Sequence, residues 1–325
     1  MQKQEIDAIV KKYELSEEEI KEISKVAYAD LVKGKPSKAN PVCVIIAGQP
    51  GAGKTGLSKY TKAHFPDAVM LDIDDFRFYH PNIKEIIDNY PECFAPTTNK
   101  FISKVSGYVT DMLIEGRYDV IAHKTLKNIL ILDDTIIPMK NAGYNVFVNA
   151  YAVNGIVSKL SAVERTQEER QKFGYNRVIS NQFHDDAYNN MVGIIVEAMK
   201  RNLLDSVQVF MRGETEIEPV IVYMQNQDGI SVEPTLCEYY SRPVGSIGEA
   251  INIGRILDYE KNHPNLIKRI QTVSNNAMYA DEKALIQVLK DDYFTFSANV
   301  ETPVEFLQIM SKNKKFNIND IPSFM

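Results

Sequence analysis

One stretch of the sequence has the residue types and the spacing of a phosphate-binding loop. It reads Gly-Gln-Pro-Gly-Ala-Gly-Lys-Thr and ends at Thr55, so it matches the G-x-x-x-x-G-K-S/T pattern at every fixed position. Glycines let the backbone curl until successive N–H groups point at a phosphate, and the N-terminus of the following helix adds a positive dipole end. In such a loop the lysine reaches the β- and γ-phosphates of ATP, and the last hydroxyl binds Mg²⁺. We therefore predict an ATP and Mg²⁺ site, with Lys54 on the phosphates and Thr55 on the metal. The residues expected to hold the nucleotide are Gly48, Gln49, Pro50, Gly51, Ala52, Gly53, Lys54, Thr55 and Gly56.

The residues on either side of the loop have the pattern of a parallel sheet covered by helices. Val42 to Ile46 are apolar without alternation, as in a strand buried on both faces, and Gly56 to His64 are compatible with a helix. Further strand patterns occupy residues 68–75, 118–122, 145–153, 206–211 and 219–224. Helical patterns occupy residues 16–32, 99–114, 129–142, 158–172, 181–204, 246–263, 266–278 and 303–312. Strands that alternate with helices in this way predict an α/β fold with a doubly wound, mainly parallel sheet.

These patterns divide the chain into three predicted parts. Residues 1–40 form a helical arm, whose main helix begins with a capping box at Ser16 and Glu19. Residues 41–225 form the core with the sheet, and residues 226–325 form a mostly helical extension. We expect the arm to pack on the core, with a regulatory cover over the site as the alternative. The C-terminal extension either packs beside the core or docks another protein.

Three aspartates, Asp72, Asp74 and Asp75, lie at the end of the second predicted strand. Ligands of a parallel sheet bind beyond the carboxyl ends of its strands, so these acids are expected at the same edge as Lys54. A carboxylate at that edge can accept a proton from a substrate hydroxyl, or hold Mg²⁺ through water. Capping of the next turn or helix is the alternative for any one of them.

The run Phe-Arg-Phe-Tyr-His-Pro comes next and ends at Pro81. Together with the phosphate loop, the run from Leu71 to Pro81 resembles the zeta toxin family, whose second motif is similar to Ile-Asp-x-Asp-x-Phe-Arg-x-x-His-Pro. Members of that family are P-loop kinases that use ATP and Mg²⁺ to phosphorylate the 3′-hydroxyl of the amino sugar in UDP-N-acetylglucosamine. The resemblance, which extends over about residues 41–225, implies a P-loop kinase-like three-layer sandwich. It also implies that Asp74 is the general base and Asp72 a supporting acid, whereas His80 is expected to be a hydrogen-bonded structural histidine.

A second part of the resemblance concerns the acceptor. After the third predicted strand the chain reads His-Lys-Thr-Leu-Lys from His123 to Lys127, where the family usually has Glu-Gly-Thr-Leu-Arg. The resemblance implies that His123, Thr125 and Lys127 contact the sugar nucleotide. His123 and Lys124 depart from the family pattern. A carboxylate can only accept hydrogen bonds, so its replacement by an imidazole changes which substrate hydroxyls can be held. The identity of the acceptor therefore stays open at this point.

Arginines in the helix pattern over residues 158–172 have two interpretations. By spacing alone, Arg165 and Glu169 are an i,i+4 pair on a solvated face. In the zeta family this segment brings two arginines over the transferring phosphate, and the resemblance gives these places to Arg165 and Arg177, with Arg170 as the alternative. Guanidinium groups suit the charge that spreads over phosphate oxygens during transfer.

Composition limits the cellular context. The formal net charge of −6 argues against an electrostatic grip on nucleic acid by the whole protein. The three cysteines are widely spaced, which favours a reduced compartment without disulfides or structural zinc. The N-terminus has no apolar signal region and no run has the length of a membrane span, so we expect a cytoplasmic protein.

The sequence thus predicts a kinase that transfers the γ-phosphate of ATP to a sugar hydroxyl. If the acceptor is UDP-N-acetylglucosamine, the resemblance implies a bacterial toxin with an antitoxin protein as partner. A kinase of the same architecture acting on a nucleotide ribose or a polynucleotide end is one alternative. A non-catalytic ATP-binding interaction protein is the other.

Overall fold

A seven-stranded sheet forms the centre of the computed structural model, which describes residues 3–175, 179–213, 219–226, 229–232 and 244–275. The strand order is β2-β3-β1-β4-β5-β6-β7. The strands are β1 (Val42–Ala47), β2 (Val69–Leu71), β3 (Val120–Lys124), β4 (Asn145–Tyr151), β5 (Ser206–Met211), β6 (Val220–Asn226) and β7 (Gly229–Val232). β1 to β5 pair in parallel, whereas β6 and β7 add an antiparallel edge. The predicted α/β class with a mainly parallel sheet is confirmed.

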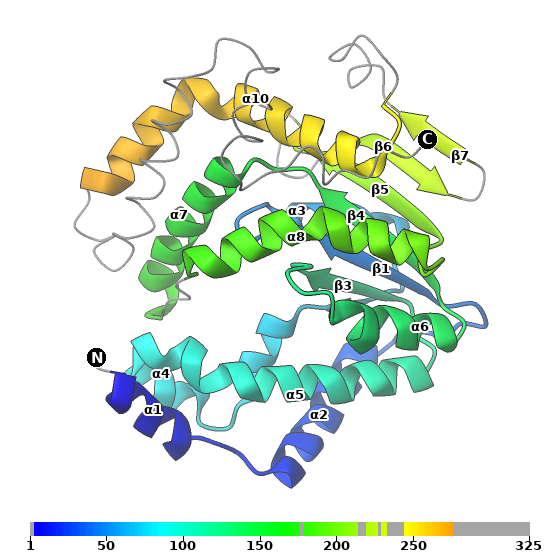
Figure 1. The fold of residues 1–325 in the computed structure, drawn as a ribbon. Coiled ribbons are helices and arrows are strands. Elements are labelled where there is room, and N and C mark those ends of the chain that lie inside the picture. Colours follow the sequence, from blue (N-terminus) through cyan, green and yellow to red (C-terminus); the bar gives the residue numbers. More distant parts are fainter. Residues whose placement is uncertain (1–2, 176–178, 214–218, 227–228, 233–243, 276–325) are drawn as a thin grey trace.

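Helices cover both faces of this sheet (Figure 1). The longer ones are α1 (Lys3–Lys12), α2 (Glu17–Val32), α3 (Lys54–His64), α5 (Phe94–Glu115), α7 (Gly155–Phe173), α8 (Asn181–Lys200) and α10 (Ile247–Asn275). The shorter ones are η1 (Ile73–Tyr79), α4 (Ile83–Asn89), η2 (Pro91–Cys93), η3 (Leu132–Ile136) and α6 (Ile137–Asn141). None of the helices in the described ranges is both long enough and apolar enough to cross a membrane.

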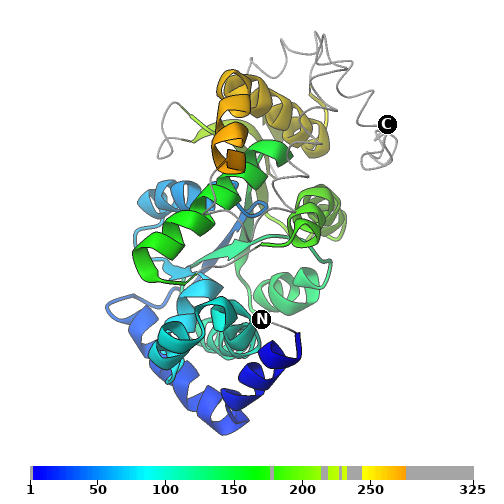
Figure 2. The ribbon, with the colours of Figure 1, turned by 90° about the vertical axis from the view of Figure 1, so that its left-hand side faces the viewer.

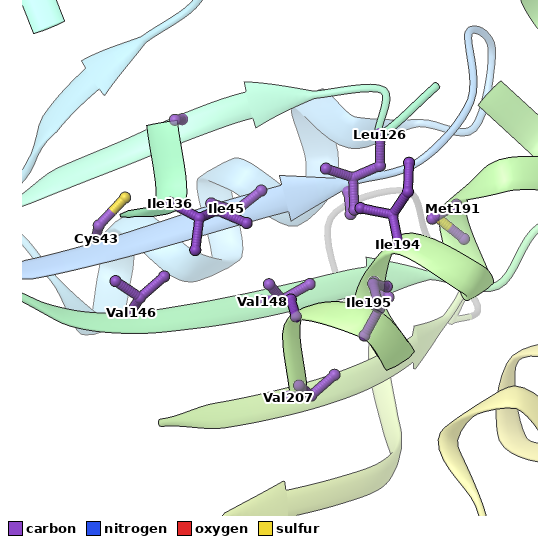
Figure 3. Close-up of a cluster of buried hydrophobic side chains, with 14 of the residues drawn as sticks. Cys43, Ile45, Leu126, Ile136, Val146, Val148, Met191, Ile194, Ile195 and Val207 are labelled. Carbon is purple, nitrogen blue, oxygen red and sulfur yellow. The ribbon is translucent and has the colours of Figure 1, made fainter. Parts of the chain in front are cut away.

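Strand β1 is buried on both faces, as its unbroken apolar run predicts. Ile45 packs with residues of α5, α6 and α8 in one large cluster, part of which Figure 3 shows. Its neighbours Val44 and Ile46 face the other way, where Leu57 of α3 packs against them. Because side chains alternate along a strand, a run without polar residues is needed to bury both faces. The loop that follows β1 therefore starts from the most buried strand of the sheet.

The N-terminal helices and α10 lie at opposite ends of the molecule, blue and gold in Figure 2. In the arm, the predicted capping box at Ser16 is present, and Ile20 and Ala27 belong to the main core cluster. At the other end, β7 extends the sheet past residue 225, and Ile247 and Ala250 of α10 join the same cluster. The arm and the start of the C-terminal segment therefore both pack against the core.

Three predicted helices differ from the observed elements. The helix expected at 129–142 is a π-helical turn, η3, followed by the short α6, because Pro138 has no N–H to bond the carbonyl one α-helical turn before it. The two helices expected at 246–263 and 266–278 are one continuous helix, α10, over its described residues. Leu266 and Ile270 continue its buried stripe, so packing carries the helix across Pro264. The helix predicted at 303–312 lies outside the described residues.

Candidate active site

The predicted phosphate loop connects β1 to α3 at the carboxyl edge of the sheet. Gly53 has a φ of 91° and serves as the N-cap of α3, so the helix begins at Lys54. The Lys54 amine is folded over the loop, where Nζ donates to the carbonyls of Gly48 (2.8 Å) and Gln49 (3.1 Å). Thr55 follows in the first turn and is exposed. A helix N-terminus below a curled backbone with a lysine over it is a cradle that fits the phosphates of ATP, with Thr55 available to Mg²⁺.

The charge state of Lys54 is set by its surroundings. Burial and, to a smaller extent, the charge of Arg165 lower the pKa of its amine, while Asp72 and Asp74 oppose this shift, and the resulting pKa is about 8. Groups shift one another's pKa in this way only at short range. The structure therefore gathers Arg165 and both predicted acids around the lysine of the loop.

We expect ATP affinity to fall as the pH rises through about 8. The ammonium form of Lys54 attracts phosphates, and phosphates raise the pKa of that amine when they bind. Above the free-state pKa of about 8 the Kd should therefore increase by about tenfold per pH unit. Titration calorimetry with Mg²⁺-ATP between neutral and alkaline pH measures this slope. Lys54→Arg, whose guanidinium stays charged, is the control and should give a flat profile. A flat profile in the wild type would contradict the expectation.

Asp74 lies in η1 and is held by a buried arginine. Arg77 donates from Nε to Asp74 Oδ1 (3.0 Å), and its Nη2 lies 2.9 Å from the same oxygen. The guanidinium is fixed in turn by Asn99 Oδ1 (2.8 Å) and by the Thr98 hydroxyl. Arg77 was not among the predicted site residues. Its position three residues after Asp74 was the available signal, because residues at i and i+3 of a helical turn lie on one face.

Asp72 caps the same turn and contacts the next strand. Its Oδ1 accepts from the backbone N–H of Asp74 (3.1 Å), and its Oδ2 lies 2.7 Å from Nδ1 of His123. His123, which was predicted to contact the sugar nucleotide, therefore contacts the carboxylate of Asp72. His80 is buried and pairs with the Tyr13 carbonyl (3.1 Å) and the backbone N–H of Asn82, which agrees with a structural histidine.

The remaining predicted acceptor residues lie on the loop after β3. Thr125 is half-buried, and Lys127 is exposed with its Nζ 4.1 Å from the ring centroid of Phe183 on α8. The carbonyl of Lys127 accepts from Asn190 of α8 (2.8 Å). Burial lowers the pKa of Lys124, which stands where the family has glycine. The loop is therefore attached to α8 through Lys127.

The predicted arginines are described only in part. Arg165 lies on α7 with its Nε 3.7 Å from Glu169, as the i,i+4 spacing predicts, and it is also close enough to act on Lys54. Arg170, the alternative, has Nη1 3.5 Å from Gln167. Arg177 lies outside the described residues. Of these side chains, Arg165 is the one whose charge lowers the pKa of Lys54 in the phosphate loop.

A buried polar network supports the loop from behind. Gln49 donates from Nε2 to the hydroxyl of Ser158 (3.1 Å), which lies 2.9 Å from Nε2 of His184. His184 in turn contacts Asp185, whose carboxylate also pairs with the buried Lys159 (2.9 Å). Although burial would raise the pKa of Asp185, the hydrogen bonds from His184 and Lys159 lower it to about 2. The loop is thereby connected to both α7 and α8.

Because His184 is buried in this network, we predict that the protein loses stability as the pH falls below neutral. Burial lowers the pKa of His184, whereas an unfolded histidine titrates near 6.5. The unfolded chain therefore binds more protons in acid, and the free energy of unfolding should decrease from about pH 7 to pH 5. Urea denaturation at several pH values measures this slope, and His184→Gln should reduce it. The exposed His64→Gln is the control. An equal slope in all three proteins would refute the prediction.

Arg212, directly after β5, was also missed by the sequence reasoning. Its Nη2 donates to the carbonyls of Gly51 (3.1 Å) and Ala52 (3.3 Å), and its Nε lies 3.9 Å from the buried carboxylate of Asp258 on α10. Asp258 also accepts from the backbone N–H of Asn154 (2.9 Å) at the start of α7. The signal was a cation at the carboxyl end of a strand, where ligands of such sheets bind. Arg212 links the phosphate loop to α10.

The sheet and the phosphate loop after β1 define a P-loop kinase-like α/β fold, which implies nucleotide binding. The family model for Zeta toxin matches residues 27–225, which is more than half of the chain. The protein therefore belongs to the Zeta toxin family, as its motifs indicated. This finding confirms the resemblance on which the site predictions rest.

Curated relatives agree with this assignment, and two solved structures are similar to the chain in fold. Toxin PezT of Streptococcus pneumoniae serotype 4 is 28% identical over 185 residues, which are 56% of this chain and 73% of that relative. Toxin zeta of Enterococcus hirae is 24% identical over 185 residues, 56% of this chain and 65% of that relative. A structure from the PezAT chromosomal toxin–antitoxin system of Streptococcus pneumoniae has a TM-score of 0.58 at 23% identity and covers 79% of this chain and 99% of its own. The complex of AvrRxo1-ORF1 and AvrRxo1-ORF2 with sulphate ions has a TM-score of 0.50 at 15% identity, with coverages of 85% and 83%. At these identities the two structures are similar in fold.

Proposed function

We propose that this protein is an ATP-dependent kinase that phosphorylates the 3′-hydroxyl of the amino sugar in UDP-N-acetylglucosamine. The observation that carries the proposal is the placement of Asp74. Its carboxylate is fixed by the buried Arg77 and acts electrostatically on Lys54 of the phosphate loop. A positioned carboxylate beside a phosphate-binding lysine can deprotonate a hydroxyl as it attacks the γ-phosphorus.

The residues of the chain take distinct roles in this proposal. The loop from Gly48 to Gly56 holds the phosphates through its backbone N–H groups, and Lys54 neutralises their charge. Thr55 would hold Mg²⁺, which when bound supplies further positive charge at the phosphate oxygens. Asp74 takes the proton of the acceptor hydroxyl, whose oxygen forms the new bond to phosphorus while the bond to the leaving ADP breaks.

Further residues are assigned to charge stabilisation and to the acceptor. We assign Arg165 and Arg177 to the transferring phosphoryl group, because guanidinium groups stabilise the charge on its oxygens. Thr125 and Lys127, on the loop attached to α8, contact the sugar nucleotide. Arg77 acts through Asp74, because its hydrogen bonds fix the direction of that carboxylate.

The cellular role follows from the product. A sugar nucleotide blocked at its 3′-hydroxyl is unusable for cell-wall precursor synthesis, so the enzyme would be toxic to a bacterial cell in whose cytoplasm it acts. Family membership and the relatives named as toxins support this role. We propose an antitoxin protein as the partner that keeps the kinase inactive, in keeping with the toxin–antitoxin system to which the PezAT structure belongs.

ADP release with a panel of acceptors tests the proposal. The purified protein is incubated with Mg²⁺-ATP and either UDP-N-acetylglucosamine, a ribonucleoside or an oligonucleotide with a free 5′-hydroxyl. The proposal predicts that only the sugar nucleotide accelerates ADP release. Acceleration by a nucleoside or an oligonucleotide would show that the enzyme phosphorylates a different hydroxyl. ATP binding without ADP release from any acceptor would favour a non-catalytic nucleotide-binding protein.

A further inference from the structure

Three polar side chains form a continuous chain from the acids to the phosphate-loop helix. Asp72 Oδ2 lies 2.7 Å from Nδ1 of His123, and Nε2 of His123 contacts the hydroxyl of Ser58. The Ser58 hydroxyl also lies 2.7 Å from the carbonyl of Lys54, one turn earlier in α3. A path of direct contacts thus joins Asp72 to the helix that begins with the ATP-binding lysine.

The sheet fixes the geometry of this chain. His123 lies on β3 between two parallel neighbours, where it is paired with Ile46 of β1. On the other side, Leu71 of β2, the residue before Asp72, is paired with Ala122. Ser58 is buried, and the side chain of His123 is 12% exposed whereas that of Asp72 is 34% exposed. Water therefore competes little for the bond between His123 and Ser58, and more for the one to Asp72. Buried hydrogen bonds between rigid elements fix orientation better than exposed ones do.

The imidazole has two polar atoms, and protein groups engage both of them. Nδ1 faces the Asp72 carboxylate and Nε2 faces Ser58, which leaves no ring nitrogen for an acceptor hydroxyl. We infer that His123 is a positioning residue, which holds Asp72 against α3, and not a ligand of the acceptor. This inference rests on the proposed function, in which Asp74 is the base, and on the supporting role that the family resemblance implies for Asp72.

Asp72 transmits this positioning to the proposed base. Its second oxygen accepts the backbone N–H of Asp74 at the first turn of η1, so a rotation of Asp72 away from His123 also releases the cap of that turn. Loss of the imidazole should therefore lower kcat through the two acids and leave acceptor binding intact. Side chains that orient metal ligands by hydrogen bonds typically contribute about 10–100-fold to activity, and we expect a loss of the same order here.

Three substitutions at one position distinguish a positioning residue from an acceptor ligand. His123→Leu should lower kcat by about 10–100-fold with the KM for UDP-N-acetylglucosamine within about twofold. His123→Asn should keep most of kcat, because its amide can still donate to Asp72. His123→Glu restores the residue type usual in the family but sets a carboxylate beside Asp72, so it should lose activity as His123→Leu does. A raised KM with unchanged kcat in His123→Leu, or full activity in His123→Glu, would overturn the inference.

A double-mutant cycle gives an independent test of the same contact. If His123 acts through Asp72, then His123→Leu should cause no further loss of kcat in an Asp72→Asn background. Additive losses would mean that the two side chains act separately. Thermal unfolding of each variant checks that the comparison is made between folded proteins.

Imidazole nitrogen NMR keeps this inference separable from the proposed kinase activity. If the wild type does not phosphorylate the sugar nucleotide, the proposed function fails, yet the His123–Asp72 contact can still be read without an acceptor. The spectrum of the ¹⁵N-labelled protein should show His123 protonated at Nδ1, with the signal assigned by its loss in His123→Asn. Asp72→Ala should shift this signal, whereas Asp75→Ala, at an exposed residue of the same turn, should not. A signal that is unchanged by Asp72→Ala would overturn the inference.

Discussion

Asp74→Asn is expected to abolish phosphoryl transfer while ATP still binds. Asparagine has nearly the same size, and its carbonyl oxygen can still accept from Arg77, so the turn should keep its shape. It cannot take a proton, however, and removal of a positioned general base costs on the order of 10²-fold or more in rate. Single-turnover phosphorylation measures the loss, and calorimetric titration with Mg²⁺-ATP should give a Kd within about threefold of the wild type.

A neighbouring aspartate provides the control for this prediction. Asp75 lies in the same turn and is exposed, so Asp75→Asn makes the same change of charge without touching the proposed base. Its rate should stay within about twofold of the wild type. If Asp74→Asn retains more than about a tenth of the wild-type rate, Asp74 is not the base, and Asp72 becomes the residue to test.

Gly51→Ala is expected to destabilise the protein even without nucleotide. Gly51 has a φ of 75°, and a Cβ at this position would lie 1.9 Å from the carbonyl oxygen of Ser158 and 2.9 Å from the backbone nitrogen of Ala162 on α7. Both obstacles are backbone atoms of a packed helix, so neither can move aside cheaply. Overpacking of this kind costs about 1–3 kcal/mol, and the left-handed φ adds about 1 kcal/mol. Chemical denaturation of the nucleotide-free protein measures the loss of unfolding free energy.

Gly34→Ala separates the clash from the backbone strain. Gly34 has a φ of 71°, close to that of Gly51, but nothing lies within 4 Å of the Cβ that alanine would add. It should therefore lose only about 1 kcal/mol. Equal losses in the two variants would show that the close approach of the loop to α7 is not what requires glycine at position 51.

The sequence predicted most of the elements that carry the nucleotide site because their signals are local. The phosphate loop, the strand before it and the helix after it are consecutive, and the five parallel strands lie at their predicted apolar runs. The second strand is shorter than predicted, because it ends at Leu71 and residues 73–75 belong to η1. β5 has the predicted bounds, Ser206–Met211. The hydrophobic pattern of residues 246–278 also predicted helical structure. Two helices were expected there, however, and the structure has the single helix α10 over its described residues. Local patterns thus predicted which elements exist better than where they end.

The contacts around Asp72 could not be predicted, because they depend on the order of strands in space. His123 reaches Asp72 only because β3 lies between β2 and β1 in the sheet, and chain order does not specify this arrangement. Arg212 approaches Gly51 for a similar reason, since residues 161 positions apart meet at one edge of the sheet. The departure of His123 from the family pattern was visible in the sequence, whereas its two partners were not.

The most direct test of the central claim is the mass and phosphate position of UDP-N-acetylglucosamine after incubation with the protein and Mg²⁺-ATP. The proposed function predicts that the wild type adds one phosphoryl group, which phosphorus–proton NMR places on the 3′-hydroxyl of the amino sugar, and that Asp74→Asn adds none. An unmodified sugar nucleotide in the presence of bound ATP would contradict the claim, as would a phosphate on the uridine ribose.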